Sequence, residues 1–498
     1  MDSVGTRSYI MKKRMLSVLL AFMMSLSLLH IGAFAADMTP PSMSDYETVS
    51  ISSAEELLKL VSGTDTSGET LGKIYRLGAD LTIDTSALET SFWGTSRKFC
   101  GVLDGNNHTV TLESNADTAL QPLFDGVVGT ATTYAGVKNL TLKVTGPVAG
   151  TTLAGCISYA SIDNVKIEFT TVSFAEYTSD GDYAVATGVF GHSLSGMPSY
   201  VTNVAVKGGT IGSEMAQDKQ YVLAAGVYTE YNLAGGTIDC RGIKVNVENI
   251  YATTSYQATD GDAACCAAGV VSGVVQSNAR VANASVNLTG NIRAIARDGS
   301  NVSQVGAYGL GHWLISMYAC DVIVGGNIEA EGSDYKNSNH YNSDIDQTVA
   351  AAGLGYMVYT KYNNVLYNAA DSGVCGVTVG GSIKATGCRE KDDSYQYDPA
   401  AIAAGTAVWA DATYPMKNIT VKAETIEAHA TNTCAAYANG FAYRVDIGGR
   451  AQGSDWNYDF VNCSVDVDTI FSSSVSNTSF ATGFIYHGYG SPCGWSDR

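Results

Sequence analysis

Carboxylates, histidines and aromatic rings are the groups of this chain that could carry chemistry. A hydrolase of the pectin-degrading kind would need two or three carboxylates on adjacent strands, flanking a glycosidic bond. Asp392-Asp393 and His487-Gly488 match parts of such a site, but the full series of motifs is not present as a set. The seven histidines lack the i, i+4 spacing of a helical metal site. We therefore assign no catalytic residue, and a β-helix polysaccharide lyase or glycoside hydrolase stays open as an alternative.

Paired aspartates recur at three turns, Asp180-Gly181-Asp182, Asp260-Gly261-Asp262 and Asp344-Ile345-Asp346. Hard oxygen ligands on turns suit Ca²⁺. None of the three turns has the full spacing of a calcium loop, so we expect solvated acidic turns. No metal site and no cofactor are assigned.

Aromatic residues gather in four segments, 311–320, 357–375, 409–417 and 443–461. Flat apolar rings with polar tips suit sugar rings or a protein partner. The alternative is that these rings fold back and pack their own loops. Under the first interpretation the partner is a carbohydrate or a surface protein. The ligand-binding candidates are Trp313, Tyr318, Tyr359, Tyr362, Trp409, Trp456 and Tyr458.

A repeated unit that runs from about residue 139 to the C-terminus must position these residues. Each copy begins with an Asn, Asp or Gly anchor followed by apolar–x–apolar, as in Asn418-Ile419-Thr420-Val421, and each closes with small–x–Gly–apolar, as in Ala267-Ala268-Gly269-Val270. Asn, Asp and Gly best tolerate a left-handed backbone, which predicts a sharp bend at every anchor. The anchors are Asn139, Asn164, Asn203, Gly242, Asn283, Asp321, Gly376, Asn418 and Asn462.

This repeat predicts an all-β solenoid. Alternation with period two, rich in Val and Ile, is typical of short strands. Units repeated at a nearly fixed spacing bury their apolar rows against their neighbours. Three short strands per unit, each entered by a bend, predict a right-handed parallel β-helix. A β-sandwich and a β-propeller are the competing architectures.

A short helix is expected before the first coil. Ser53-Ala54-Glu55-Glu56 is a capping box, and the apolar residues from Leu57 to Val61 follow it. An open end of a β-helix exposes unpaired strand edges, so a helix at this place predicts a cap.

The segment GVLDGNNHTVTL at 101–112, with Leu123-Phe124, Val137-Lys138-Asn139-Leu140 and Gly188-Val189-Phe190-Gly191, resembles the opening of secreted bacterial β-helix proteins with GLUG-type repeats. The resemblance covers residues 50–200 well and the rest loosely. It implies a secreted or cell-surface protein, often adhesin-like, and it provides no shared catalytic residues. These motifs are structural, so they indicate architecture more than activity.

The N-terminus predicts a secretory signal peptide over residues 1–35. Lys12-Lys13-Arg14 precede an apolar run, and Ala33-Phe34-Ala35 is a cleavage site, so cleavage is expected after Ala35. A linker over 36–50 and a β-helix over 51–498 follow, with coils of about 40 residues that could continue past Arg498. The expected location is secreted or on a bacterial cell surface, with no membrane insertion after cleavage.

The charge of the chain limits its possible partners, and the cysteine positions suggest one disulfide. A net charge of −19 with only 15% charged residues argues against nucleic acid as a partner. Cys320 and Cys375 each lie one residue before an anchor of successive coils, within reach of a disulfide if the coils stack. Small buried thiols are the alternative for these and the other nine cysteines.

The function expected from these features is that of an exported, surface-associated, adhesin-like binding protein. The lyase or hydrolase is the second class, and a passive structural spacer that presents another domain is the third.

Overall fold

The structure is a computed structural model of the chain. It describes residues 42–489, and the expected signal peptide therefore lies outside the described residues. Within that span the undescribed residues are 66–67, 91–95, 115–117, 178–181, 195–197, 231–237, 258–262, 274–278, 298–299, 301, 303, 333–347, 360–374, 388–398, 412–415, 432–434, 447–459 and 476–478.

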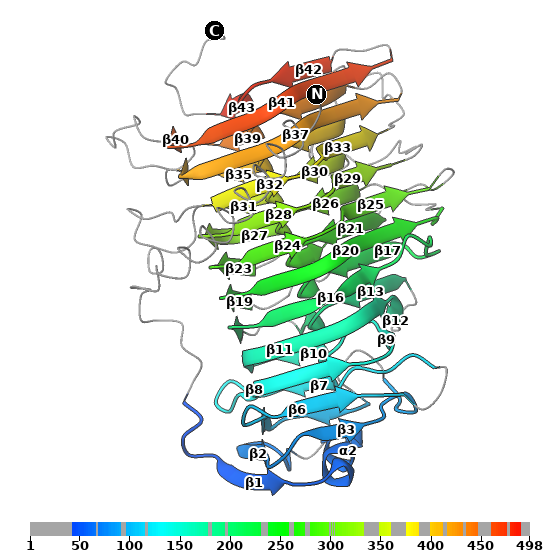
Figure 1. Cartoon of the computed structure of the whole chain (residues 1–498), viewed down its shortest axis with the longest axis vertical. Coiled ribbons are helices and arrows are strands. Elements are labelled where there is room, and N and C mark those ends of the chain that lie inside the picture. The colour runs from blue at the N-terminus through cyan, green and yellow to red at the C-terminus, as the bar shows by residue number, and fades with distance from the viewer. Residues whose placement is uncertain are drawn as a thin grey trace, which may run out of the picture. The chain divides into compact units, whose positions relative to one another are not determined.

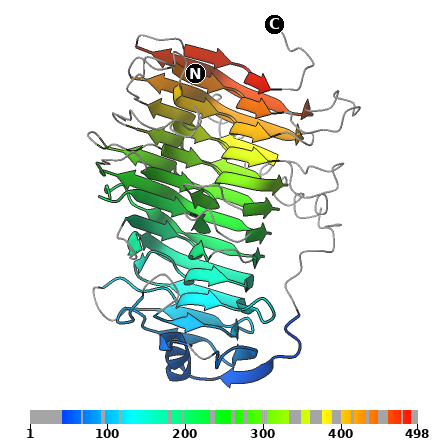
Figure 2. The same cartoon turned by 180° about the vertical axis from the view of Figure 1, so that it is seen from behind.

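The chain folds as a right-handed parallel β-helix (Figures 1 and 2). Nearly every strand pairs in parallel with the strands one coil before and one coil after it. β16, for example, pairs with β11 on one side and β20 on the other. In Figure 1 the strands nearest the viewer run from left to right while the coils rise, which defines the right-handed turn. The predicted fold class is confirmed.

Each coil has three walls, which we name by their sequence. The anchor wall follows the anchor residue, the glycine wall carries the small–x–Gly segment, and the return wall leads back to the next anchor. The anchor wall contains β3 (Leu81–Ile83), β6 (Thr109–Leu112), β8 (Ala135–Val144), β9 (Val148–Ala149), β11 (Ala160–Ser173), β16 (Ala205–Gly212), β20 (Lys244–Thr254), β24 (Ser285–Leu288), β25 (Ile292–Ala296), β28 (Asp321–Val324), β29 (Ile328–Glu331), β32 (Cys375–Val379), β33 (Ser382–Gly387), β37 (Ile419–Ala430) and β41 (Ser464–Ser474).

The glycine wall contains β12 (Ala175–Tyr177), β13 (Tyr183–Thr187), β17 (Tyr221–Ala225), β21 (Ala264–Ala268), β26 (Gln304–Tyr308), β30 (Val349–Ala352), β34 (Pro399–Ala404), β38 (Ala435–Asn439) and β42 (Ser479–Thr482). Here β12 is the exception in direction, since it pairs antiparallel with β13.

The return wall contains β4 (Lys98–Phe99), β7 (Phe124–Val128), β10 (Ala154–Ser158), β14 (Phe190–Ser193), β18 (Tyr228–Glu230), β22 (Val271–Gly273), β27 (Gly311–Tyr318), β31 (Gly355–Tyr359), β35 (Ala407–Asp411), β39 (Ala442–Asp446) and β43 (Ile485–Tyr489). Short strands then lead to the anchors: β15 (Ser199–Thr202), β19 (Ile238–Arg241), β23 (Ala279–Ala282), β36 (Met416–Lys417) and β40 (Phe460–Val461). The corresponding strands before the first anchor, Asn139, are β1 (Glu47–Ile51), β2 (Lys73–Leu77) and β5 (Val102–Asp104).

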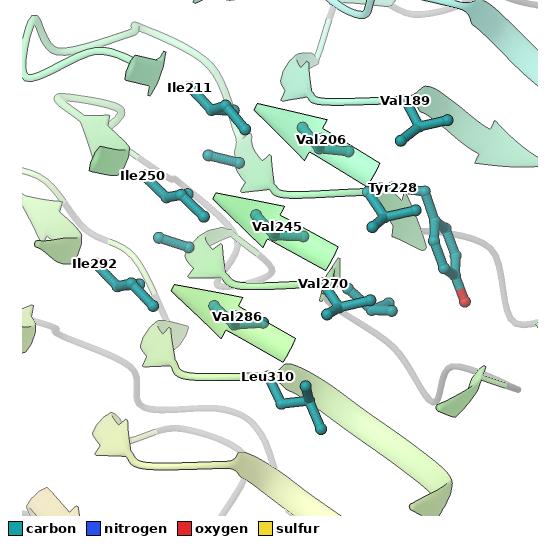
Figure 3. Packing of buried hydrophobic residues seen from close by; sticks show 14 of the residues in the cluster. Val189, Val206, Ile211, Tyr228, Val245, Ile250, Val270, Val286, Ile292 and Leu310 are labelled. Carbon is teal, nitrogen blue, oxygen red and sulfur yellow. The ribbon is translucent and has the colours of Figure 1, made fainter. Parts of the chain in front are cut away.

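The core consists of side-chain columns that run from coil to coil (Figure 3). Val206, Val245 and Val286 form one column, at the second apolar position after the anchor, and all three are fully buried. A parallel column contains Ile211, Ile250 and Ile292. Because equivalent residues stack in register, one apolar row per wall is enough to bury a continuous core.

A column of glycines explains the small–x–Gly element. A Cβ on Gly269 would lie 2.1 Å from the carbonyl oxygen of Gly309 and 2.8 Å from Cγ1 of Val286, both in the next coil. The same two contacts, with the glycine carbonyl and the valine of the following coil, recur at Gly226 and Gly405. The coils therefore approach each other too closely here for any side chain.

The predicted capping helix is α2 (Ala54–Ser62), and it has both hydrogen bonds of the capping box between Ser53 and Glu56. Leu57 and Val61 are buried in the core at the N-terminal end of the stack. The first strand, β1, begins at Glu47, inside the segment 36–50 that we expected to be a linker. The Ser and Thr content of segment 36–50 is typical of a linker. Val49 and Ile51 nevertheless alternate inward and pair with β2, so the linker prediction is wrong for the residues that form β1.

Seven of the nine predicted anchors have the expected left-handed backbone, with φ between 50° and 63°. They are Asn139, Asn164, Asn203, Gly242, Asn283, Asn418 and Asn462. Asparagine side chains also connect successive anchors: Asn164 Nδ2 donates to Asn139 Oδ1 at 3.0 Å, and Asn462 Nδ2 to Asn418 Oδ1 at 3.2 Å. The asparagines thus supply both the bend and a ladder of hydrogen bonds between coils.

The prediction is wrong for Asp321 and Gly376. Both lie inside extended strands and pair with each other, and Asp321 also pairs with Ser285 rather than with Asn283. The left-handed residue of that coil is Ala319, with φ 48°, two residues earlier. A shift of two residues along a strand keeps every side chain on the same face, so the alternation could not distinguish the two alignments. The corresponding residue of the next coil, at position 374, lies outside the described residues.

Cys320 and Cys375 are therefore first apolar positions of adjacent coils. Both are buried free thiols, and the backbone N–H of Cys320 lies 3.5 Å from Sγ of Cys375. The expected proximity is confirmed, and the thiols fill the core column that other coils fill with Val204 or Ile243.

Candidate functional site

The structure places four of the seven predicted aromatic residues on strands rather than on loops. Trp313 lies in β27 and Trp409 in β35, both half-buried, and Tyr318 is the last residue of β27. Tyr359 ends β31, but its side chain lies outside the description. Tyr362, Trp456 and Tyr458 lie outside the described residues, as do the expected acidic turns except for Asp182.

Register brings the two tryptophans into one column on the outer side of the return wall. Trp313 pairs with Met357, and Met357 pairs with Trp409. Trp409 in turn pairs with Arg444, whose guanidinium carbon lies 4.0 Å from the centre of the indole ring. This geometry is a cation–π contact between neighbouring coils. We call Trp313, Met357, Trp409 and Arg444 the return-wall column.

The column rests on a second apolar cluster, separate from the central core. This outer cluster lies on the outward side of the glycine wall, because Tyr308 belongs to it while its neighbour Ala307 faces the central core. Its buried members are Ala268, Tyr308, Ala350, Ala352, Tyr356, Met357, Ile402, Ala404, Val408, Ala435 and Tyr437, and Trp313 and Trp409 pack against it. Trp313 and Trp409 are therefore held against this cluster and are each partly buried.

Polar groups in the outer cluster are also buried. His312 is 2% exposed, and its Nε2 lies 2.6 Å from Nε2 of Gln304. Its ring stacks on Tyr356 with centroids 5.2 Å apart. Burial raises the pKa of the Tyr308 phenol well above its usual value, so this ring stays neutral. These groups hold the column in place rather than offering a proton for catalysis.

A cysteine and a histidine that the sequence analysis did not single out lie side by side in the return wall. Cys156 of β10 pairs with His192 of β14, and Asp125 of β7 is buried nearby. Desolvation lowers the pKa of His192 to about 3 and raises that of the Cys156 thiol, so both stay neutral near pH 7. A nucleophilic cysteine needs its thiolate and access to substrate. Both residues are completely buried, so this pair is structural.

An open cleft of about 450 Å³ lies between α2 and the first strands. Two of its three acidic side chains, those of Glu56 and Asp65, already have structural roles. Glu56 closes the capping box, and Asp65 accepts hydrogen bonds from the backbone N–H groups of Glu69 and Thr70 at 2.7 Å each. The cleft therefore offers no unengaged pair of carboxylates for chemistry.

Among the residues described, no three His, Cys, Asp or Glu side chains lie close enough together to hold a metal ion. The one helix of the described chain is too short and polar to cross a bilayer. Comparisons with protein-family models, with curated proteins and with solved structures each give no match. The similarity to GLUG-type repeat proteins therefore rests on the motifs quoted above.

Proposed function

We propose that the protein is an exported, surface-associated, adhesin-like binding protein that recognises a glycan or a surface protein through the return-wall column. The observation that carries this proposal is the alignment of Trp313, Trp409 and Arg444 in one column of the return wall, with Met357 on the coil between the two tryptophans. Indole rings offer flat apolar faces to sugars, and arginine adds hydrogen-bond donors beside them. The secretory signal predicted over residues 1–35 and the GLUG resemblance support the location.

Rigid strands favour binding at this column. Trp313 and Trp409 both pack against the outer cluster, so little side-chain entropy remains to be lost when a ligand binds. Binding residues on strands are also held more precisely than residues on loops. A repeated wall can extend the contact over several coils, which suits a polymeric ligand.

The test is binding of the labelled protein to a printed array of neutral and acidic glycans and to intact bacterial cells. Replacing Trp313, Trp409 and Trp456 with Ala should reduce binding at least about tenfold, since anchoring aromatics commonly contribute more than 1.4 kcal/mol. The matched control is Tyr251→Ala, an aromatic residue of the anchor wall, which should leave binding unchanged.

Two of these tryptophans also pack against the outer cluster, so the triple variant must retain its circular dichroism spectrum. Trp409→Phe combined with Arg444→Gln keeps most of the packing and removes the indole and the cation together. Unchanged binding in both folded variants would overturn the assignment of the site. A wild-type protein that binds neither glycans nor cells would support a passive spacer instead.

A further inference from the structure

Four exposed lysines form a zigzag on the outer side of the anchor wall, one on each of four consecutive coils. They are Lys143 in β8, Lys166 in β11, Lys207 in β16 and Lys244 in β20. The strands β8, β11, β16 and β20 lie side by side in that order (Figure 1). Successive coils are about 4.8 Å apart, so the lysines recur at that rise along the stack.

Two adjacent columns of the wall make this zigzag. In the first column Lys166 pairs with Thr141 on one side and with Ala205 on the other, and Ala205 pairs with Lys244. In the second column Lys143 and Lys207 both pair with Glu168. The ammonium groups therefore alternate between the two columns from coil to coil.

These lysines are not engaged within the protein. In the described part of the chain none of the four makes an ion pair or a side-chain hydrogen bond, whereas some arginines of the described chain are paired. Arg76 lies 3.2 Å from Asp104, and Arg293 lies 2.9 Å from Glu329. Glu168 is the only acidic residue in the two columns across these four coils, so this strip is positive on a chain of net charge −19.

We propose that this face of the anchor wall binds a linear acidic polysaccharide that lies along the stack of coils. An extended polyuronate presents one carboxylate per sugar, and in a two-fold conformation these alternate between the two sides of the polymer. That arrangement complements ammonium groups that alternate between two columns at one per coil. Thr141 and Asn246 lie in the same columns and can donate hydrogen bonds to sugar hydroxyls.

Charge density favours a polysaccharide over nucleic acid. Duplex DNA carries one negative charge per roughly 1.7 Å of its axis, far denser than one lysine per coil. Single strands are usually held by stacking on aromatic side chains. The two columns contain no aromatic residue across these coils, and the net charge of −19 repels a dense polyanion.

The experiment is affinity electrophoresis of the purified protein in gels that contain polygalacturonate, amylose or no polymer. Polygalacturonate should retard the protein, and amylose should not. Replacing Lys143, Lys166, Lys207 and Lys244 with Gln should raise the apparent dissociation constant for polygalacturonate at least about tenfold. Added NaCl should also weaken the binding of the wild-type protein, because exposed charges are screened. These positions are exposed, so the variant should keep its fold, as circular dichroism can verify.

The matched control is Lys384→Gln with Lys422→Gln, on later coils of the same wall, compared with Lys166→Gln with Lys207→Gln. Both double variants lower the net charge equally, but only Lys166→Gln with Lys207→Gln should reduce binding. Equal loss in the two pairs, absence of binding by the wild type, or equally tight binding of single-stranded DNA would overturn the proposal. The tryptophan variants leave this wall intact, so the two proposed sites fail independently.

Discussion

Individual residues at the bends show how far the repeat could be interpreted from sequence. Asparagine has a strong preference for the left-handed backbone among non-glycine residues, so Asn203 and its equivalents could be recognised directly. Ala319 could not, because alanine has no such preference, while Asp321 two residues later is of the expected type. The error lies in the alignment of two successive coils, at Asp321 and Gly376, and leaves the faces of their strands unchanged.

Ala319 provides a stability test of the bend. A left-handed conformation costs an L-residue about 1 kcal/mol, and Asn tolerates it better. Ala319→Asn should therefore raise the free energy of unfolding by roughly 0.5–1 kcal/mol, measured as a higher melting temperature. Ala205→Asn is the control, since Ala205 lies in an ordinary strand where Asn is disfavoured. A lower melting temperature for Ala319→Asn than for the unmodified protein would contradict this account of the bend.

At the level of elements, the sequence predicted where the strands lie but not what limits their approach. The small–x–Gly segments were recognised as strands, whereas the reason for the glycine is a carbonyl oxygen of the next coil. A second ladder was missed: Asn249 accepts from the N–H of Asn291 at 2.9 Å, and Asn291 from that of Asn327 at 2.7 Å. Its signal was visible in the near-identical segments VGGNIEAEG and VGGSIKATG, because Gly326 and Gly381 lie against these side chains.

The glycine column can be tested with one substitution at two places. Gly269→Ala would bring a methyl group within 2.1 Å of the carbonyl oxygen of Gly309, which forces two coils apart. The expected cost is about 1–3 kcal/mol, as for overpacking of a core. A Cβ on Gly483 would meet nothing within 4 Å. Gly483→Ala should therefore be neutral, and equal melting temperatures for the two variants would refute the role of the column.

For the whole molecule, the fold class was predictable because the same sequence pattern, an anchor, alternating apolar residues and a small–x–Gly segment, recurs from coil to coil. The proposed binding surfaces were less predictable, because they depend on which residues face solvent and on how successive coils align them. Trp313 and Trp409 were expected in loops, yet they lie on strands where register aligns them. The zigzag of lysines likewise emerges only when the coils are stacked, since these four residues are far apart in sequence and unremarkable one by one.

Burial also differs along the stack and predicts where the molecule opens first. The inward-facing side chains of the central coils are almost fully buried, whereas β41 has no buried residue and Phe471 in it is 48% exposed. In a solenoid each unit is stabilised mainly by its neighbours. Hydrogen exchange followed by mass spectrometry should therefore show the slowest exchange in β20 to β33 and faster exchange in β41 and β42. Uniform protection along the chain would contradict this gradient.

The parallel pairing of every coil with the next has a mechanical consequence. The backbone hydrogen bonds between coils point along the direction of stacking, so a tensile load on the chain ends opens them one coil at a time, like a zipper. Asn164 and Asn203 are 39 residues apart, so one such step would release roughly 130–140 Å of extended chain. If the protein is held on a surface and binds a ligand as proposed, it would lengthen stepwise under a tensile load, and the bound ligand would not experience the full force at once.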